Sequence, residues 1–274
     1  MFLINGHISE RLSAQDRGLQ YGDGVFETIA VRQKELLCWE PHYRRLKTGC
    51  DFLGIDCPSS SLLINEAAQL EYNSELAVLK IIITRGQGGR GYRPPVPKTP
   101  ATRILGLYPW PDYPEENYIQ GVKTKICQTR LGHNPQLAGI KHLNRLEQVL
   151  ARSEWDQPEI AEGLMLDIDD NVIEGTMSNL FIIKDQKLMT PDLSQCGVNG
   201  IVREHILALA PVIGLPVQVT SVKQTDLYAA DELFLCNSVM GIWAVNMLDT
   251  RQYKPGPWTQ KIRAQLIEQK IIVN

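Results

Sequence analysis

The sequence lacks any excess of positive charge and any long apolar run. Its 28 lysines and arginines are outnumbered by 31 aspartates and glutamates, which argues against a nucleic-acid binder driven by phosphate contacts. No apolar stretch approaches the roughly 20 residues that cross a bilayer. The first residues, Met1 to His7, lack the charged start and longer apolar stretch of a signal peptide. We therefore expect a cytoplasmic enzyme without nucleic-acid or membrane partners.

Metal-ligand signatures are also missing. The six cysteines are scattered, with no close pair at zinc-ligand spacing, and the five histidines form no His-x-x-x-His pattern. No Gly-x-Ser-x-Gly elbow occurs, although a Ser/His/Asp triad built from distant residues stays open. We expect no metal, and thiols that are buried in a reducing compartment.

The chain is long enough for one large domain or two ordinary ones, with 274 residues of which 43% are hydrophobic. Strand-like and helix-like segments alternate along it, which predicts a mixed α/β (α+β) fold. The segment from Tyr108 to Asn117 has three prolines within six residues, and prolines interrupt regular elements. We therefore predict an N-terminal domain at 1–109, a linker at 110–120 and a C-terminal domain at 121–274, with a cofactor in the cleft between the domains.

Periodicity predicts the individual elements of both domains. Helices are expected to start near Pro41 and to be capped near Ser59. Further helices are expected near 201–210 and 258–269. Strands are expected near 25–32, 78–84, 102–107, 122–128, 162–167, 172–174, 179–183, 217–219, 232–236 and 242–245. The glycine- and proline-rich loop from Gly86 to Pro100 is too long for a mere turn, and long loops of this kind are often functional.

Lys141 and Glu174 are the most informative residues. Lys141 ends an apolar run just before an amphipathic helix, and Glu174 stands in a Gly/Ser/Asn turn between two strand-like runs. Such a pair suits a pyridoxal phosphate enzyme, in which a lysine forms the Schiff base and a carboxylate keeps the pyridine nitrogen protonated. Most lysines are instead solvated surface charges, so the pair alone leaves both interpretations open.

Other segments suit an anion. The turn from Gly197 opens a helix at Ile201, where backbone N–H groups suit a phosphate. Ser238 ends a strand, and Arg45 on the first long helix could give a phosphate a bidentate partner. The loop from Thr84 to Arg93, with three arginines and a tyrosine, suits a carboxylate-bearing substrate. Plain turn chemistry, polar strand ends, surface arginines and nonspecific anion contacts are the ordinary alternatives.

Taken in order, these segments resemble the fold type IV class of pyridoxal phosphate enzymes. That class contains branched-chain aminotransferases, D-amino acid aminotransferases and 4-amino-4-deoxychorismate lyases. The resemblance covers essentially the whole chain. The segments that carry it are Tyr21–Glu27, His42-x-x-Arg45-Leu46, Lys141, Glu174-x-x-x-Ser178-Asn179-Leu180-Phe181 and Gly197–Ile201.

The resemblance implies pyridoxal 5'-phosphate as the cofactor. It also implies a homodimer in which each substrate loop reaches across to the partner's site. Lys141 resembles the Schiff-base lysine, and Glu174 the carboxylate on the pyridine nitrogen. The residues that resemble the phosphate cup are Arg45, the backbone of Gly200, Ile201 and Val202, and Ser238 with Asn237 beside it.

Within the class, two segments resemble the lyases: the lysine segment from Ile140 to Leu150 and the loop from Thr84 to Tyr92. Arg90 and Tyr92 fall where D-amino acid aminotransferases trap the substrate carboxylate. Thr28 also resembles the lyases, because branched-chain enzymes have glycine there and D-amino acid enzymes an apolar residue. Glu27 is more similar to the aminotransferases, which leaves a side transaminase activity open.

The expected reaction converts 4-amino-4-deoxychorismate to 4-aminobenzoate and pyruvate in folate biosynthesis. Lys141 is expected to remove a proton from the ring carbon that bears the nitrogen, and Thr28 to relay a proton to the leaving group. One alternative is an aminotransferase with the same Lys141 and Glu174. A second is a non-catalytic homologue that keeps the fold.

Overall fold

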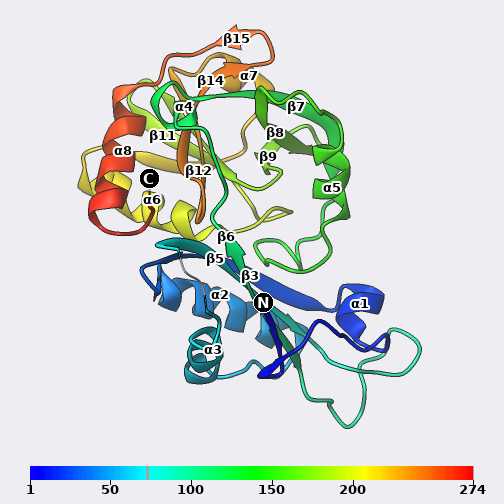
Figure 1. Cartoon of the computed structure of the whole chain (residues 1–274). Helices are drawn as coiled ribbons and strands as arrows, with labels where there is room; N and C mark the ends of the chain where they lie inside the picture. Colours follow the sequence, from blue (N-terminus) through cyan, green and yellow to red (C-terminus); the bar gives the residue numbers. More distant parts are fainter. Residues whose placement is uncertain (72–73, 274) are drawn as a thin grey trace. The chain divides into compact units, whose positions relative to one another are not determined.

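The computed structural model describes residues 1–71 and 74–273 (Figure 1). Asn274, the last residue of the predicted C-terminal domain, lies outside the described residues. The chain divides into two compact units. The first unit consists of Met1–Pro111 and Ile140–Asn144; the second consists of Asp112–Gly139 and the chain from Arg145 onward. Each unit combines a sheet with helices, so the predicted mixed α/β class is confirmed.

The predicted boundaries at 1–109, 110–120 and 121–274 stay a prediction. Two features of the structure bear on how they are drawn. The short segment that carries Lys141 groups with the first unit, although it lies far along the chain from the rest of that unit. The prolines of the predicted linker follow the last strand of the first unit and precede a one-turn helix, α4 (Glu116–Ile119).

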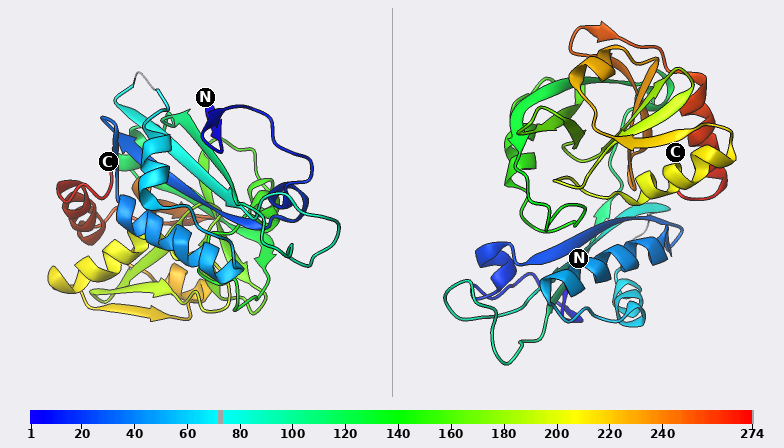
Figure 2. Two further views of the ribbon diagram at one scale, coloured as in Figure 1. Left: turned by 90° about the horizontal axis from the view of Figure 1, so that it is seen from below. Right: turned by 180° about the vertical axis from the view of Figure 1, so that it is seen from behind.

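The first unit is built on an antiparallel sheet with helices packed on one face (Figures 1 and 2). In β3 (Gly24–Arg32), Val25 and Ile29 point into the core between the sheet and these helices, because alternate side chains of a strand share a face. Glu27 has the same parity and points to the same side. The strand order is β2 (His7–Ile8), β1 (Phe2–Ile4), β6 (Thr102–Pro109), β5 (Leu76–Thr84), β3 (Gly24–Arg32) and β4 (Glu35–Leu36).

The two main helices of this unit begin and end on local signals. Helix α2 (Trp39–Leu53) has Pro41 in its first turn, where a missing N–H costs nothing, and ends at Gly54, which is left-handed at φ 68°. Helix α3 (Ser60–Ala67) is capped by Ser59, whose hydroxyl accepts from Leu62 N. The predicted cap at Ser59 is confirmed.

The second unit is built on a nine-stranded sheet. Helices α6 (Ile201–Val212) and α8 (Pro257–Glu268) cover one face, where the rings of Phe181 and Phe234 stack 5.1 Å apart (Figure 2). On the other face Trp243 packs in a second core. The strand order is β12 (Val217–Thr220), β11 (Lys187–Pro191), β10 (Asn179–Lys184), β13 (Glu232–Asn237), β14 (Gly241–Leu248), β7 (Val122–Leu131), β8 (Ile160–Asp167) and β9 (Val172–Gly175), with β15 (Arg251–Gln252) beside β14.

Several short elements were not expected from periodicity, among them α1 (Arg17–Tyr21), β11 and α7 (Gln224–Tyr228). The turn between β10 and β11 explains one of them. Asp185 and Gln186 adopt left-handed backbone angles of 48° and 57°, the conformation of a tight hairpin turn that Asn-Gly usually signals. Because Asn-Gly is missing here, the sequence does not predict the hairpin. None of the helices in residues 1–71 and 74–273 is long and apolar enough to cross a membrane.

Candidate functional site

Lys141 is fixed by main-chain pairing to β3 of the first unit. Phe26 N donates to the carbonyl of Lys141 at 3.0 Å, and Leu143 N donates to the carbonyl of Gly24 at 3.0 Å. The segment that carries the lysine therefore runs along the start of β3. The Lys141 ammonium lies 4.4 Å from the centre of the Phe26 ring. These contacts hold Lys141 at the boundary of a regular element, as the sequence predicted.

Thr28 shares one face of β3 with Phe26, because the two residues are two positions apart on a strand. Its neighbour on β5 is Lys80, whose ammonium lies 5.4 Å from the same Phe26 ring. This face thus brings together Thr28, Phe26 and the amines of Lys80 and Lys141. Lys80 was not among the predicted residues, since a single lysine in an apolar strand has no distinctive pattern. The relay role of Thr28 stays a prediction.

The opposite face of β3 holds a buried charged cluster. Glu27 accepts hydrogen bonds from Arg45 Nε at 2.8 Å and Arg45 Nη2 at 2.6 Å, and its Oε2 lies 2.6 Å from His42 Nδ1. His42 and Arg45 are three residues apart on α2, so both meet the strand from one side of the helix. The bidentate contact fixes the plane of the guanidinium. The predicted phosphate role of Arg45 stays a prediction. Glu27 is the residue that orients the Arg45 guanidinium.

The three groups control one another's charge. Burial raises the pKa of Glu27, but Arg45 and His42 outweigh burial and bring it down to about 2. Burial lowers the pKa of His42; Glu27 opposes this effect, and the positive charges of Arg45 and Lys141 add to it. His42 is therefore neutral at pH 7 and donates its Nδ1–H to Glu27. Its buried Nε2 has no hydrogen-bond partner in the described part of the chain.

In the second unit, the buried Glu174 meets the predicted anion-binding turn. Its Oε2 accepts from Val198 N at 2.8 Å. Gly197 is left-handed at φ 91°, and a Cβ there would lie 2.8 Å from side-chain carbons of Ile173 and Leu193. Only glycine lets this turn approach the carboxylate so closely. Two motifs that lie more than twenty residues apart in the sequence are thereby joined, as a common site requires.

The start of α6 offers main-chain donors suited to a phosphate. Its N-cap is Gly200, so no side chain of the N-cap residue accepts from the first turn. The first hydrogen bond within the helix runs from Glu204 N to Gly200 O. The N–H groups of Ile201 and Val202 therefore lack helical partners and lie at the positive end of the helix dipole. A Cβ on Gly200 would collide with the side chain of Asn179. The donor set fits the phosphate of the predicted cofactor.

Asn237 and Ser238 lie at the end of β13. The side chain of Asn237 is engaged with protein: its Nδ2 donates to Met177 O at 3.0 Å, and its Oδ1 accepts from Val239 N and Met240 N at 2.8 Å each. The predicted cofactor contact of Asn237 stays a prediction. Ser238 follows it and is half-buried.

Sequence reasoning missed Glu162 on β8, which is buried and surrounded by five donors. Its Oε1 accepts from Gly163 N at 2.9 Å, Thr176 N at 3.1 Å and Thr176 Oγ1 at 2.5 Å. Its Oε2 accepts from Met177 N at 3.1 Å and Ser178 Oγ at 2.8 Å. Glu162 thus holds the turn that directly follows Glu174. An acidic residue inside an apolar strand was the available signal, because buried carboxylates are rare unless they are paired.

The ionisation of Glu162 follows from its surroundings. Burial raises the pKa of its carboxyl above the ordinary value, and the hydrogen bonds from Thr176, Ser178, Gly163 and Met177 offset only part of that rise. Three of the five neighbouring groups are main-chain N–H groups that can only donate, whereas the hydroxyls of Thr176 and Ser178 can donate or accept.

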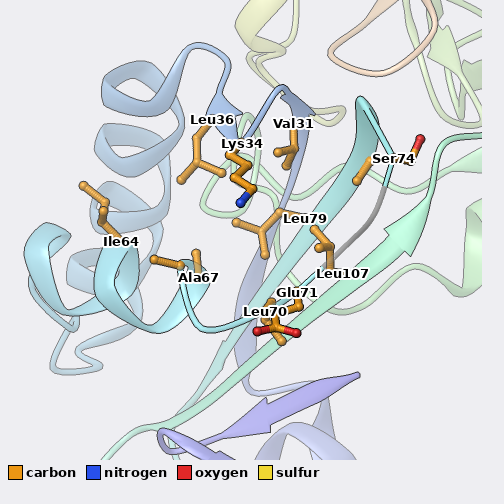
Figure 3. Close-up of a pocket in the computed structure, with 12 residues that line it drawn as sticks. Val31, Lys34, Leu36, Ile64, Ala67, Leu70, Glu71, Ser74, Leu79 and Leu107 are labelled. Atoms are coloured by element: carbon orange, nitrogen blue, oxygen red, sulfur yellow. The ribbon is translucent and has the colours of Figure 1, made fainter.

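A cavity of about 540 Å³ in the first unit lies apart from these groups (Figure 3). Figure 3 shows mainly aliphatic side chains around it, with Lys34 and Glu71 as the charged ones. No predicted catalytic or cofactor residue contributes to its lining, which is Val31, Lys34, Leu36, Ile64, Ala67, Ala68, Leu70, Glu71, Ser74, Ala77, Leu79 and Leu107.

None of the six cysteines, all of which lie in the part of the chain that the structure describes, forms a disulfide. Within residues 1–71 and 74–273, no three His, Cys, Asp or Glu side chains gather closely enough to hold a metal ion.

The Glu27 cluster should make folding sensitive to acid. Because its pKa is lowered from 4.5 to about 2, Glu27 stabilises the fold fully above pH 4.5 and loses that contribution as the pH falls toward 2. The contribution is on the order of 3 kcal/mol. In urea titrations at several pH values, the difference in unfolding free energy between wild type and Glu27→Gln should shrink by about that amount in acid. Asp51→Asn is the control, since its pair with Lys47 is exposed. A difference independent of pH would contradict this account.

The turn after Glu174 should depend on Glu162. In Glu162→Gln an NH2 group faces main-chain donors. We therefore expect the free energy of unfolding, measured by urea denaturation, to fall by about 1–3 kcal/mol, and the binding of pyridoxal phosphate to weaken. Glu232→Gln is a matched control, because Glu232 is also buried and accepts from Trp258 N, Thr259 N and Thr259 Oγ1, at the start of α8. The control should lose similar stability and keep cofactor affinity. Equal cofactor affinity in both variants would refute the role of Glu162.

Comparisons with known proteins agree on one family. The family model described as amino-transferase class IV matches residues 24–248. The aminodeoxychorismate lyase of Vibrio harveyi is 39% identical over 254 residues, 93% of this chain and 93% of that protein. A putative branched-chain-amino-acid aminotransferase of Methanocaldococcus jannaschii is 31% identical over 245 residues, 88% of this chain and 84% of that protein.

A solved structure gives the same answer. The crystal structure of 4-amino-4-deoxychorismate lyase from Pseudomonas aeruginosa matches with a TM-score of 0.92 and 45% identity, over 98% of each chain. The family that the sequence motifs predicted is confirmed. With most of its length matched by the family model and with relatives that span nearly all of it, this chain belongs to the class IV amino-transferase family.

Proposed function

We propose that this chain is a pyridoxal phosphate-dependent lyase that converts 4-amino-4-deoxychorismate to 4-aminobenzoate and pyruvate, a step of folate biosynthesis. The observation that carries the proposal is its likeness to two such lyases, at 39% and 45% identity over at least 93% of each chain. The likeness to the aminotransferase described above is lower, at 31%. The retained Lys141 and Glu174 favour an enzyme over a non-catalytic homologue.

Bound pyridoxal phosphate supplies an electron sink for the negative charge that develops at the substrate carbon bearing the nitrogen. The amine of Lys141 would hold the cofactor, and the same amine would serve as the base that takes the proton from that ring carbon. Its attachment to β3 through Phe26 supports this role, because the main-chain bond limits how far the lysine can shift. The substrate's ether C–O bond then breaks, the ring becomes aromatic, and the released enol becomes pyruvate.

Glu174 would hold the proton on the cofactor's pyridine nitrogen. The hydrogen bond from Val198 N supports this role, because it fixes one carboxylate oxygen. The main-chain N–H groups of Gly200 to Val202 would bind the phosphate, together with Arg45 and Ser238. Thr28 passes a proton to the departing oxygen, and its place on the same face of β3 as Phe26 supports that assignment.

A homodimer is part of the proposal. Helix α5 (Leu146–Arg152) exposes three apolar side chains, Leu146, Val149 and Leu150, at 76%, 61% and 57%. A contiguous apolar patch of this kind typically marks an interface, and a second copy of the chain is the occupant we propose. In that dimer the loop with Arg90 and Tyr92 binds the substrate carboxylates in the partner's site. Six cysteines without a disulfide support a reducing compartment such as the cytoplasm.

Lys141→Ala should abolish both turnover and the visible absorbance of lysine-bound cofactor. The assay adds aminodeoxychorismate to cofactor-loaded protein and follows pyruvate with lactate dehydrogenase and 4-aminobenzoate by fluorescence. Equal amounts of both products are expected from the wild type and neither from the variant. A fully active variant would refute the role of Lys141. A yellow wild-type protein that makes neither product but transaminates D-alanine or leucine would move the function to the aminotransferases.

Mixed dimers test the shared loop. Lys141→Ala and Arg90→Ala subunits should each be nearly inactive alone. If Arg90 serves the partner's site, a mixed dimer has one intact site, and an equal mixture regains about a quarter of wild-type activity by random pairing. If Arg90 serves its own subunit, mixing restores nothing. Sedimentation of each variant is the control that both still form dimers.

A further inference from the structure

Arg17 is a buried arginine that ties α1 to a distant loop. Its side chain is only 3% exposed, so its charge must be matched by acceptors. Nε donates to Asp23 Oδ2 at 2.8 Å. Nη1 donates to the carbonyl of Gly91 at 2.9 Å, and Nη2 to the carbonyl of Tyr92 at 3.0 Å. One guanidinium therefore joins the start of the chain to main-chain oxygens more than seventy positions later.

Asp23 helps to hold the other end of this loop, segment 86–92, through Arg85, which directly precedes it. It accepts from Arg85 Nε at 2.7 Å and from Arg85 Nη2 at 2.9 Å, in addition to Arg17. Burial raises the pKa of Asp23, but the hydrogen bonds and charges of Arg85 and Arg17 outweigh burial, and the pKa is lowered. The ionised Asp23 thus binds both arginines at neutral pH. Segment 86–92 is anchored before its first residue by Arg85 and at its last two by Arg17.

Tyr21 completes the attachment. The Arg17 guanidinium lies 4.8 Å from the centre of the Tyr21 ring, and the Tyr21 hydroxyl accepts from Gly91 N at 3.1 Å. The rings of Tyr21 and Tyr92 meet edge to face at 5.5 Å. Close packing also depends on Gly88, where a Cβ would lie 2.7 Å from Arg17 Cδ. The main chain of the loop is therefore packed against α1 on several sides.

The side chains of the loop are presented outward. Tyr92 remains 85% exposed, and Arg90 is exposed as well. Because Arg17 binds carbonyl oxygens, its own hydrogen bonds to the loop involve neither the Arg90 nor the Tyr92 side chain. A loop that is ordered before binding avoids the entropic cost of being ordered by the ligand. We propose that Arg17, supported by Asp23 and Tyr21, is a positioning residue that preorganises segment 86–92 to bind the carboxylates of the substrate.

This proposal rests on the proposed function only for the identity of the substrate. Attachment of the loop is a separate property that can be measured without turnover. Trypsin is a suitable probe, because the segment offers cleavable bonds after Arg85 and Arg90, whereas Arg93 precedes Pro94 and resists cleavage. In the wild type the bond after Arg90 should be cut slowly.

The experiment compares cofactor-loaded wild type, Arg17→Met, Tyr21→Phe and the control Arg11→Met. Arg11 is exposed and lies near Arg17 in the sequence. Arg17→Met should be cut after Arg90 about tenfold faster, and its KM for aminodeoxychorismate should rise about tenfold, as expected when hydrogen bonds to the loop are lost. Its kcat and the absorbance of its bound cofactor should stay at wild-type values. Tyr21→Phe should change in the same direction by a smaller factor, and Arg11→Met should not change.

Each other outcome overturns a defined part of the proposal. Unchanged cleavage in both Arg17→Met and Tyr21→Phe would show that these residues do not hold the loop. Faster cleavage with unchanged KM would show that the held loop does not bind substrate. If Arg17→Met does not fold, Tyr21→Phe decides between these results, because it removes only one acceptor. A wild type without lyase activity refutes the proposed function, while the cleavage rates still test the attachment.

Discussion

A carboxylate removed from water must be surrounded by donors, and the candidate residues of both units depend on this constraint. In the first unit, Glu27 orients Arg45 and Asp23 joins Arg17 to Arg85. In the second unit, Glu162 holds the turn that follows Glu174. Each carboxylate has donors from parts of the chain that are distant in sequence. The geometry around the chemistry is therefore fixed by charge, since an unpaired buried charge costs far more than a lost apolar contact.

Glu162 and Glu174 illustrate how similar groups acquire different tasks. They lie on the paired strands β8 and β9 of one sheet, and both are buried. Glu162 accepts five hydrogen bonds, one from its own strand and four from the turn that follows Glu174. Its task is to hold that turn in place. Glu174 is approached by Val198 N, which belongs to the turn that leads into α6. Its surroundings thus connect it to main-chain donors that suit an anion.

Much of the fold was predictable because its signals are local. The alternation of β3, the cap at Ser59 and the apolar spacing of α6 follow from neighbouring residues, and the structure contains these elements close to the expected bounds. Helix α1 and strand β11 were missed for physical reasons. Helix α1 has five residues and depends on the Asp16 cap and on contacts of Arg17 with a remote loop. Strand β11 follows a hairpin turn without glycine.

By itself, the sequence determined the family and the candidate residues Lys141 and Glu174, because the motifs that carry them are short and keep their order along the chain. Tertiary structure alone decided what holds those residues. The pairing of Lys141 with Phe26, the anchoring of the turn by Glu162 and the attachment of Gly91 to Arg17 all join segments that are far apart in sequence. Strand pairing and burial bring such groups together, and no local pattern records which donor will meet which buried acceptor.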